Sequence, residues 1–364
     1  MDKKISRRSF MKKAAVIGTA VTAFPTIFVR KTPAMWEPGN AIHPNVDNLR
    51  VVGITDTQMT KSVKPVSSWA VQESLVNKDI VWENIDKMAC SLAQTKSPGD
   101  AWKAIFVKPP KKSWSDTVVA IKTNHISVQH TRSAVMSKIC NALTDTMGVK
   151  ASNIYIYDAS KHGTSLSRDT PFDGLPEGCK IVDQWGGSFK PAVVSLKGSQ
   201  STAQCLEHFV DETVDILINI SMCKGHRLSQ LGQFTMTMKN HFGTFEPRPG
   251  HEKNGLDYLI GINKSAEILG PMDKQTGRII YPRQQLCFVD ALWASKDGPS
   301  GNPSHQPNFL GMGVFSPIVD YVLATRFRRD KMGYPLNIDA TRQMLSDFGY
   351  TEEDLSNGGN IIQA

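Results

Sequence analysis

The chain has 364 residues, of which 40% are hydrophobic, and its formal net charge is +8. Residues 1–34 hold eight of the 42 Lys and Arg residues but only one of the 34 acidic residues, so the remainder has a net charge of +1. Because residues 35–364 are nearly neutral, the positive charge of the chain does not indicate nucleic-acid binding. These residues are enough to form one large domain or two intergrown domains with a sizeable buried core.

The N-terminus has the pattern of a twin-arginine export signal. Arg7 and Arg8 lie in the segment SRRSFMK, an apolar run follows from Ala14 to Val29, and Thr32-Pro33-Ala34 is a small-residue cleavage site. We predict that residues 1–34 are a signal peptide and that the twin-arginine translocase is a partner during export. The mature protein is then periplasmic or otherwise extracytoplasmic, with no stable membrane span after cleavage, although an uncleaved anchor is the alternative.

Residues 35–48 are rich in Pro and Asn and predict an extended arm ahead of the main domain, 49–350. That domain opens with a predicted strand at 49–54 and a helix at 81–93, which Ser97-Pro98-Gly99 ends. The segment 203–210 has helical spacing, and the polar loop 160–177 carries turn signals.

A strand–helix–strand unit is predicted by residues 117–122, 133–147 and 153–157. Two strands joined by a helix in about forty residues form a right-handed crossover, so the sheet is at least partly parallel. The polar side chains at the carboxyl ends of its two strands are Lys122, Asn124 and Asp158.

The near-continuous apolar run 214–220 is typical of a strand buried on both faces in the middle of a parallel sheet. Cys223, Lys224 and His226 follow it directly, and ligands of open α/β sheets bind at the carboxyl ends of strands. We therefore expect the functional site there, the alternative being a basic surface loop.

The C-terminal part predicts a strand at 286–290, a rigid turn at 297–303 and a helix at 316–329 with Ser316 as its N-cap. A last helix at 339–348 precedes a tail, 351–364. The expected fold class is α/β, with a mixed, largely parallel sheet and helices on both faces.

Several of these segments resemble the family called domain of unknown function 362. They are Ala120-Ile121-Lys122-Thr123-Asn124, Lys224-Gly225-His226, Met238-Lys239-Asn240-His241-Phe242-Gly243, Val289-Asp290, Asp297-Gly298-Pro299 and Ser316-Pro317-Ile318-Val319-Asp320. The resemblance runs from about Leu49 to Tyr350 and implies a fold and a common site, but no reaction. Many relatives carry an appended ferredoxin segment that is not expected here, and Ser316 stands where an aspartate is usual.

The cationic groups of these segments predict a site for a small carboxylate or phosphate. The candidate catalytic residues are His226 and Lys239 for proton transfer and Lys224 for charge stabilisation. The candidate ligand-binding residues are Lys122, Asn124, Asn240 and Asp158. If residues 235–242 form a helical turn, Thr235 and Lys239 align at positions i and i+4.

Cys223, His226, His241 and His251 form a candidate ligand set for a transition metal. The six cysteines show no close spacing of the kind that binds iron–sulfur clusters, so such a cluster is not expected. Whether the protein binds a transition metal or no cofactor stays open.

The sequence thus favours an exported enzyme that acts on a small anionic ligand at a Lys/His/Asn site. The alternative is a non-catalytic periplasmic protein that binds an anion or a metal. A strongly shifted lysine pKa would favour the enzyme, because binding alone does not require one.

Overall fold

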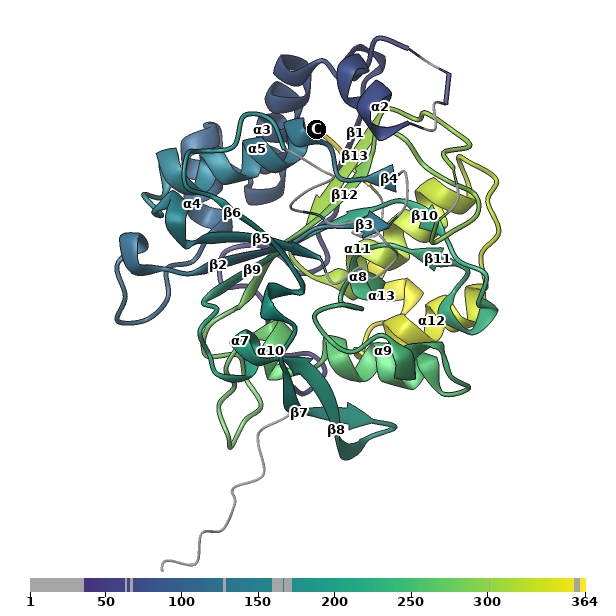
Figure 1. Cartoon of the computed structure of the whole chain (residues 1–364). Helices are drawn as coiled ribbons and strands as arrows, with labels where there is room; N and C mark the ends of the chain where they lie inside the picture. The colour runs from purple at the N-terminus through teal and green to yellow at the C-terminus, as the bar shows by residue number, and fades with distance from the viewer. Residues whose placement is uncertain are drawn as a thin grey trace, which may run out of the picture. The chain divides into compact units, whose positions relative to one another are not determined.

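A computed structural model describes residues 36–62, 64–65, 68–126, 129–158, 166, 172–300, 302–356 and 361–364. Its centre is an eight-stranded sheet (Figure 1) in which only β13 runs against the other strands. The order is β14 (Ile362–Gln363), β1 (Val52–Thr55), β13 (Phe309–Gly313), β12 (Gln284–Ala291), β9 (Ile216–Met222), β2 (Val119–Lys122), β5 (Ile154–Asp158) and β6 (Lys180–Asp183). The expected fold class, a mixed and largely parallel α/β sheet, is confirmed.

The predicted central strand is β9, which pairs in parallel with both β2 and β12. All seven of its residues are buried because helices cover both faces of the sheet. Each face of the sheet has its own hydrophobic core. Ile218 and Ile220 pack into the core on the first face, and Leu217 packs into the core on the second face.

The helices divide between these two faces (Figure 1). The first face carries α3 (Lys78–Ala93), α4 (Pro98–Ile105) and α5 (Ser133–Asn141). The second carries α8 (Thr237–Asn240), α9 (Gly255–Asn263), α11 (Ser316–Val322) and α12 (Ile338–Ser346). The shorter elements are α2 (Trp69–Leu75), α7 (Glu207–Val210), α10 (Ala266–Leu269), α13 (Glu352–Ser356), β3 (His125–Ile126), β4 (Gln129–His130), β10 (Lys224–Gly225) and β11 (Phe234–Thr235).

The predicted strand–helix–strand unit is β2, α5 and β5, with β2 and β5 parallel as expected. α5 continues as a π turn over Ala142–Thr146, and α11 continues in the same way over Leu323–Arg329. The helix starts differ in detail. Ser97 begins α4 by accepting a hydrogen bond from the Asp100 amide, and Phe315, not Ser316, is the N-cap of α11.

The helix expected at 203–210 is wrong for its first half. Ala203–Leu206 belongs to β8 (Ser199–Leu206), which forms an antiparallel hairpin with β7 (Phe189–Leu196). The turn between them places Lys197 at φ 51° and Gly198 at φ 75°, and two positive φ values in a row suit the right-handed twist of a two-residue hairpin. Only Glu207–Val210 is helical.

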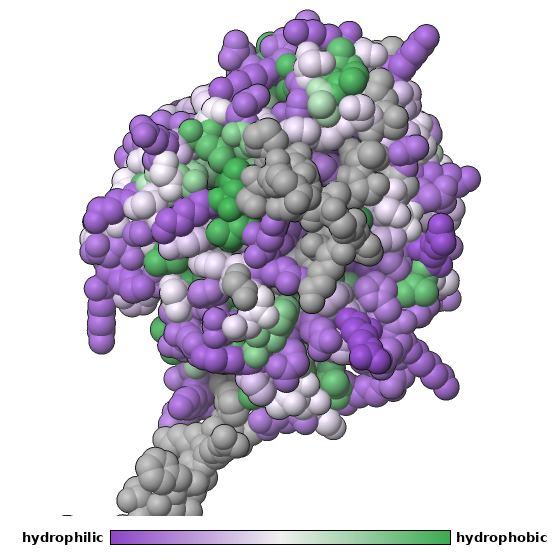
Figure 2. Space-filling view, in the orientation of Figure 1, coloured by the Kyte–Doolittle hydropathy of each residue, from purple (hydrophilic) through white to green (hydrophobic). Residues whose placement is uncertain are grey.

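Both ends of the described chain pack on this sheet. Trp36 of the expected arm is buried against Phe315 and Phe348, and β14 of the expected tail pairs with β1. The predicted loop 160–177 and the signal segment lie largely or wholly outside the described residues. Within the part that is described, no helix is long and apolar enough to cross a membrane. Hydrophilic side chains predominate on the face that Figure 2 shows.

Candidate functional site

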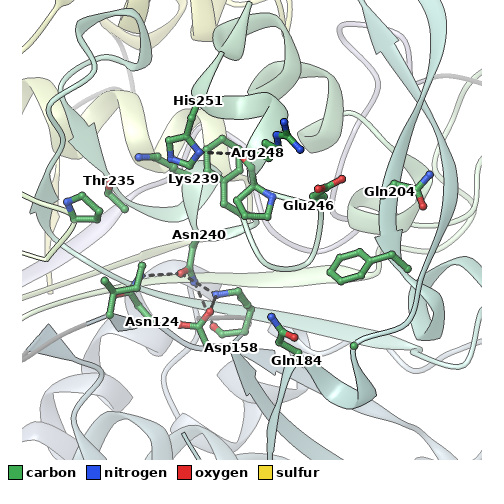
Figure 3. A pocket seen from close by; sticks show the side chains of 17 residues that line it. Asn124, Asp158, Gln184, Gln204, Thr235, Lys239, Asn240, Glu246, Arg248 and His251 are labelled. Carbon is green, nitrogen blue, oxygen red and sulfur yellow. Dashed lines mark hydrogen bonds and ion pairs between the residues drawn. The ribbon is translucent and has the colours of Figure 1, made fainter. Parts of the chain in front are cut away.

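A cavity of about 650 Å³ opens beyond the carboxyl ends of β2 and β5 (Figure 3). α8 and the segment 242–251 form one wall, and the β7–β8 hairpin forms another. Its lining combines charged, amide and aromatic side chains: Lys122, Asn124, Ile126, Asp158, Gln184, Gly187, Phe189, Gln204, Thr235, Lys239, Asn240, Phe242, Glu246, Pro247, Arg248, His251 and Pro299. All four predicted ligand-binding residues and Lys239 are among them.

Lys122 and Asp158 form a buried ion pair at the base of the cavity. Lys122 Nζ lies 2.7 Å from Asp158 Oδ1 and donates to the Thr123 carbonyl oxygen at 2.6 Å. Asp158 Oδ2 accepts from the His125 amide at 2.5 Å. Burial lowers the pKa of Lys122, and the Asp158 carboxylate opposes that shift. The pair therefore brings little net charge to the cavity.

Asn240 ties α8 to the strand ends through its amide. Its Nδ2 donates to Asn219 Oδ1 at 2.8 Å and to the Ile220 carbonyl oxygen at 3.1 Å, and its Oδ1 accepts from Asn124 Nδ2 at 3.3 Å. Because the two strands and α8 share this side chain, Asn240 fixes their spacing.

The short helix α8 is held at its N-terminus by Asp320. The Asp320 carboxylate accepts from the amides of Thr237 at 2.7 Å and Met238 at 2.9 Å. Burial raises the pKa of Asp320 to about 7, although these bonds favour its charged form. Asp320 thus positions the helix that carries Lys239 and Asn240, a role that its place at the start of α11 does not reveal.

Lys224 is buried behind the cavity and does not line it. Its Nζ donates to Asn124 Oδ1 at 2.6 Å and to the carbonyl oxygens of Gln129 at 2.7 Å and Ile126 at 3.2 Å. These three acceptors use the full donor capacity of an ammonium. Burial lowers its pKa to about 7. Lys224 therefore positions Asn124, and its predicted role in charge stabilisation stays a prediction.

Lys239 lines the cavity with no bonded partner. Its side chain is buried, and its Nζ has no hydrogen-bond acceptor among the described residues. Burial lowers its pKa to about 6. The ammonium position also lies 5.6 Å from the centre of the Phe242 ring. An amine in this state is largely uncharged at neutral pH, so it can accept a proton.

His251 and His226 lie beside Lys239. The His251 ring lines the cavity and its Nδ1 donates to the Pro247 carbonyl oxygen at 2.8 Å. The ring of His226 lies 5.9 Å from that of His251, and its Nδ1 accepts from the Leu228 amide at 3.2 Å. Burial, and then the neighbouring Lys239, lowers the pKa of His226 to about 3, so its ring is neutral.

The structure does not bring the four candidate metal ligands together. Nε2 of the buried His241 lies 2.7 Å from Gln284 Oε1 and 3.0 Å from Asn219 Nδ2. Cys223 is buried beside Arg328, and burial raises the pKa of its thiol. Across the described ranges, no group of three or more His, Cys, Asp or Glu side chains is placed to hold a metal ion. Metal binding stays a prediction that nothing here tests.

Several lining residues were not predicted from the sequence. Phe189 and Gln204 come from the unexpected hairpin, and Glu246 and Arg248 come from the irregular segment after Phe242. No periodicity marks so short a segment, so only His251 and the family-like motif before it pointed to this wall.

A model of the family described as Domain of unknown function (DUF362) matches residues 119–325. The match spans β2 to α11 and its π turn, and so includes both walls and the base of the cavity. Comparisons with curated proteins and with solved structures found no match.

Proposed function

The chain belongs to the DUF362 family, and from that premise and the site geometry we propose that it is an exported enzyme acting on a small organic anion. The anion, a carboxylate or a phosphate, binds in the 650 Å³ cavity, and Lys239 transfers a proton to or from it. No appended ferredoxin segment is part of this proposal.

The observation that carries the proposal is the state of Lys239. A buried amine without an acceptor is costly to keep charged, and a protein that only binds an anion has no need of one. A pKa of about 6 places the amine near the value at which a general base works best at neutral pH. His251 also lines the cavity, and the neutral ring of His226 lies behind it, with the two ring centres 5.9 Å apart.

Arg248 supports the anionic character of the ligand. Its guanidinium lines the cavity mouth, and no ion pair joins it to a carboxylate of the described part of the chain. A guanidinium can hold a carboxylate or phosphate through two parallel hydrogen bonds. The carboxylate of Glu246 lines the same cavity and offsets the positive charge of Arg248. We therefore expect a ligand that carries little more than a single negative charge.

The test uses phenylpyruvate and inorganic phosphate as probes of the two anion classes, with binding measured by calorimetry. We expect at least one probe to bind, and Lys239→Met to weaken it by about 2- to 10-fold, the size of a lost hydrogen bond to an uncharged amine. Lys253→Met, at an exposed lysine, is the matched control and should bind as the unaltered chain does.

Proton transfer is followed as exchange of the carbon-bound hydrogens of phenylpyruvate in D2O. Exchange that exceeds both buffer and Lys239→Met supports the enzyme. Lys239-dependent binding without exchange of any bound probe favours the non-catalytic anion-binding protein. If neither probe binds, or if Lys239→Met binds equally well, the proposed site is wrong.

A further inference from the structure

Two polar atoms of residues that line the cavity lack hydrogen-bond partners in the described part of the chain. Lys239 Nζ and Thr235 Oγ1 are both buried, both belong to lining residues, and neither has a hydrogen-bond partner among the described residues (Figure 3). Buried polar groups nearly always have partners, so polar groups of a bound ligand that engage these two atoms would satisfy both.

We propose that Lys239 is a nucleophile that forms a Schiff base with a carbonyl-bearing organic acid bound in the cavity. This inference rests on the proposed function and names its substrate class, an organic acid that carries an aldehyde or ketone. A cavity lining that offers an amine and a hydroxyl, with no described carboxylate paired to the amine, suits a carbonyl: the amine attacks the carbon and the hydroxyl bonds the oxygen.

The reaction is balanced without any further reagent. The Lys239 Nζ lone pair forms a bond to the carbonyl carbon, and the electrons of the C=O double bond move to the oxygen. That oxygen takes up a proton from the Thr235 hydroxyl, which recovers one from the nitrogen. The hydroxyl of this carbinolamine then takes up the second proton of the nitrogen by the same relay and leaves as water, while the nitrogen lone pair forms the C=N bond as the C–O bond breaks. The amine and the carbonyl compound thus yield an imine and one water molecule.

The remaining lining residues fit the rest of such a molecule. Arg248 at the mouth suits the carboxylate, while Ile126, Phe189 and Phe242 offer apolar and aromatic surface for the carbon body. The Phe242 ring lies 5.6 Å from Lys239 Nζ, where it stabilises the protonated imine through its π face. A cavity of about 650 Å³ is roomier than a three-carbon acid requires, so the favoured substrate has an aryl or branched body.

The experiment traps the imine as a stable secondary amine. The full mature chain is incubated with phenylpyruvate or pyruvate and sodium cyanoborohydride, which reduces protonated imines, and the modified peptide is identified by mass spectrometry. We expect one adduct at Lys239, formed at least tenfold faster with phenylpyruvate than with pyruvate. Lys239→Met should form none, and the control Lys253→Met should form it at the normal rate.

Thr235→Val should slow trapping at saturating phenylpyruvate at least tenfold, a larger effect than its loss of affinity, because the hydroxyl relays the proton in the chemical step as well as bonding the carbonyl oxygen. Peptide mapping of the unaltered chain carries the test even if a variant fails to fold. An adduct confined to exposed lysines overturns the inference. So does Lys239-dependent binding of phenylpyruvate without an adduct; the proposed function then still stands if the bound probe exchanges its carbon-bound hydrogens in D2O. If phenylpyruvate and phosphate both fail to bind, both proposals are wrong.

Discussion

At the scale of residues, the three buried lysines of the family-like motifs differ in what surrounds their ammonium groups. Lys122 faces the Asp158 carboxylate, Lys224 has three neutral oxygen acceptors, and Lys239 has no acceptor among the described residues. A paired ammonium and a fully accepted one hold structure together, whereas an unaccepted amine is available to a ligand. The sequence groups all three in similar motifs, so only the side-chain environment assigns their roles.

The low pKa of Lys239 predicts a specific pH dependence of stability. Its folded-state pKa is about 6 against an ordinary 10.5, so between these values the unfolded chain binds more protons than the folded one. The stability of the unaltered chain should therefore rise relative to Lys239→Met as pH increases from 7 to 9, by roughly 1 kcal/mol per pH unit. The difference in stability between the two proteins should become constant below about pH 6, where Lys239 is protonated in both the folded and the unfolded state.

Denaturant unfolding at several pH values measures this difference, and other titrating groups cancel in it. The control Lys253→Met should show a difference that does not change with pH. A flat difference for Lys239→Met would mean that Lys239 keeps an ordinary pKa, and would remove the argument for a neutral amine.

At the scale of elements, two motifs far apart in the chain touch backbone to backbone. A Cβ built on Gly225 would lie 1.9 Å from the Lys296 carbonyl oxygen, and one on Gly298 would lie 2.2 Å from the Gly225 carbonyl oxygen. Glycine at both positions lets β10 and the turn after β12 meet, and this contact places Pro299 at the cavity and Lys224 behind it.

Gly225→Ala should therefore destabilise the protein by roughly 1–3 kcal/mol or more, because backbone atoms cannot move aside as a side chain can. Gly99→Ala is the matched control: a Cβ there meets nothing within 4 Å, and its place in α4 favours alanine. Thermal unfolding compares the two variants. Equal melting temperatures would show that the contact between β10 and the turn is looser than the structure has it.

The elements that the sequence did not predict lack a strong local signal. β8 begins with the polar run Ser199–Thr202, and β13 contains Gly311 and Gly313, which weaken a strand pattern. A Cβ at Gly311 would lie 2.8 Å from Leu323 Cδ1, so the leucine side chain would have to shift to admit it. β9 and the unit from β2 to β5 were predictable because their apolar runs are nearly continuous. These strands also predicted the sheet edge at which the site lies. The hairpin wall depends on contacts made only after folding.

At the scale of the whole described domain, the sheet is closed by segments from opposite ends of the chain. Val52 of β1 pairs with Ile362 of β14, and β1 also pairs with β13, so the edge of the sheet is complete only once residues 361–364 are in place. Near the other end of the described chain, the ring of Trp36 packs against the rings of Phe315 and Phe348.

Replacement of both Arg7 and Arg8 by lysine should leave folded precursor in the cytoplasm. The substitution keeps both positive charges, so it tests whether the translocase reads the guanidinium groups rather than the charge. Cell fractionation should show loss of the periplasmic form, and the retained protein should resist proteolysis over residues 36–364 because its fold does not depend on export. The matched control, Lys12→Arg with Lys13→Arg, exchanges the same two residue types outside the arginine pair and should be exported normally. An unchanged periplasmic yield of the Arg7/Arg8 variant would show that the N-terminal segment is not a twin-arginine signal.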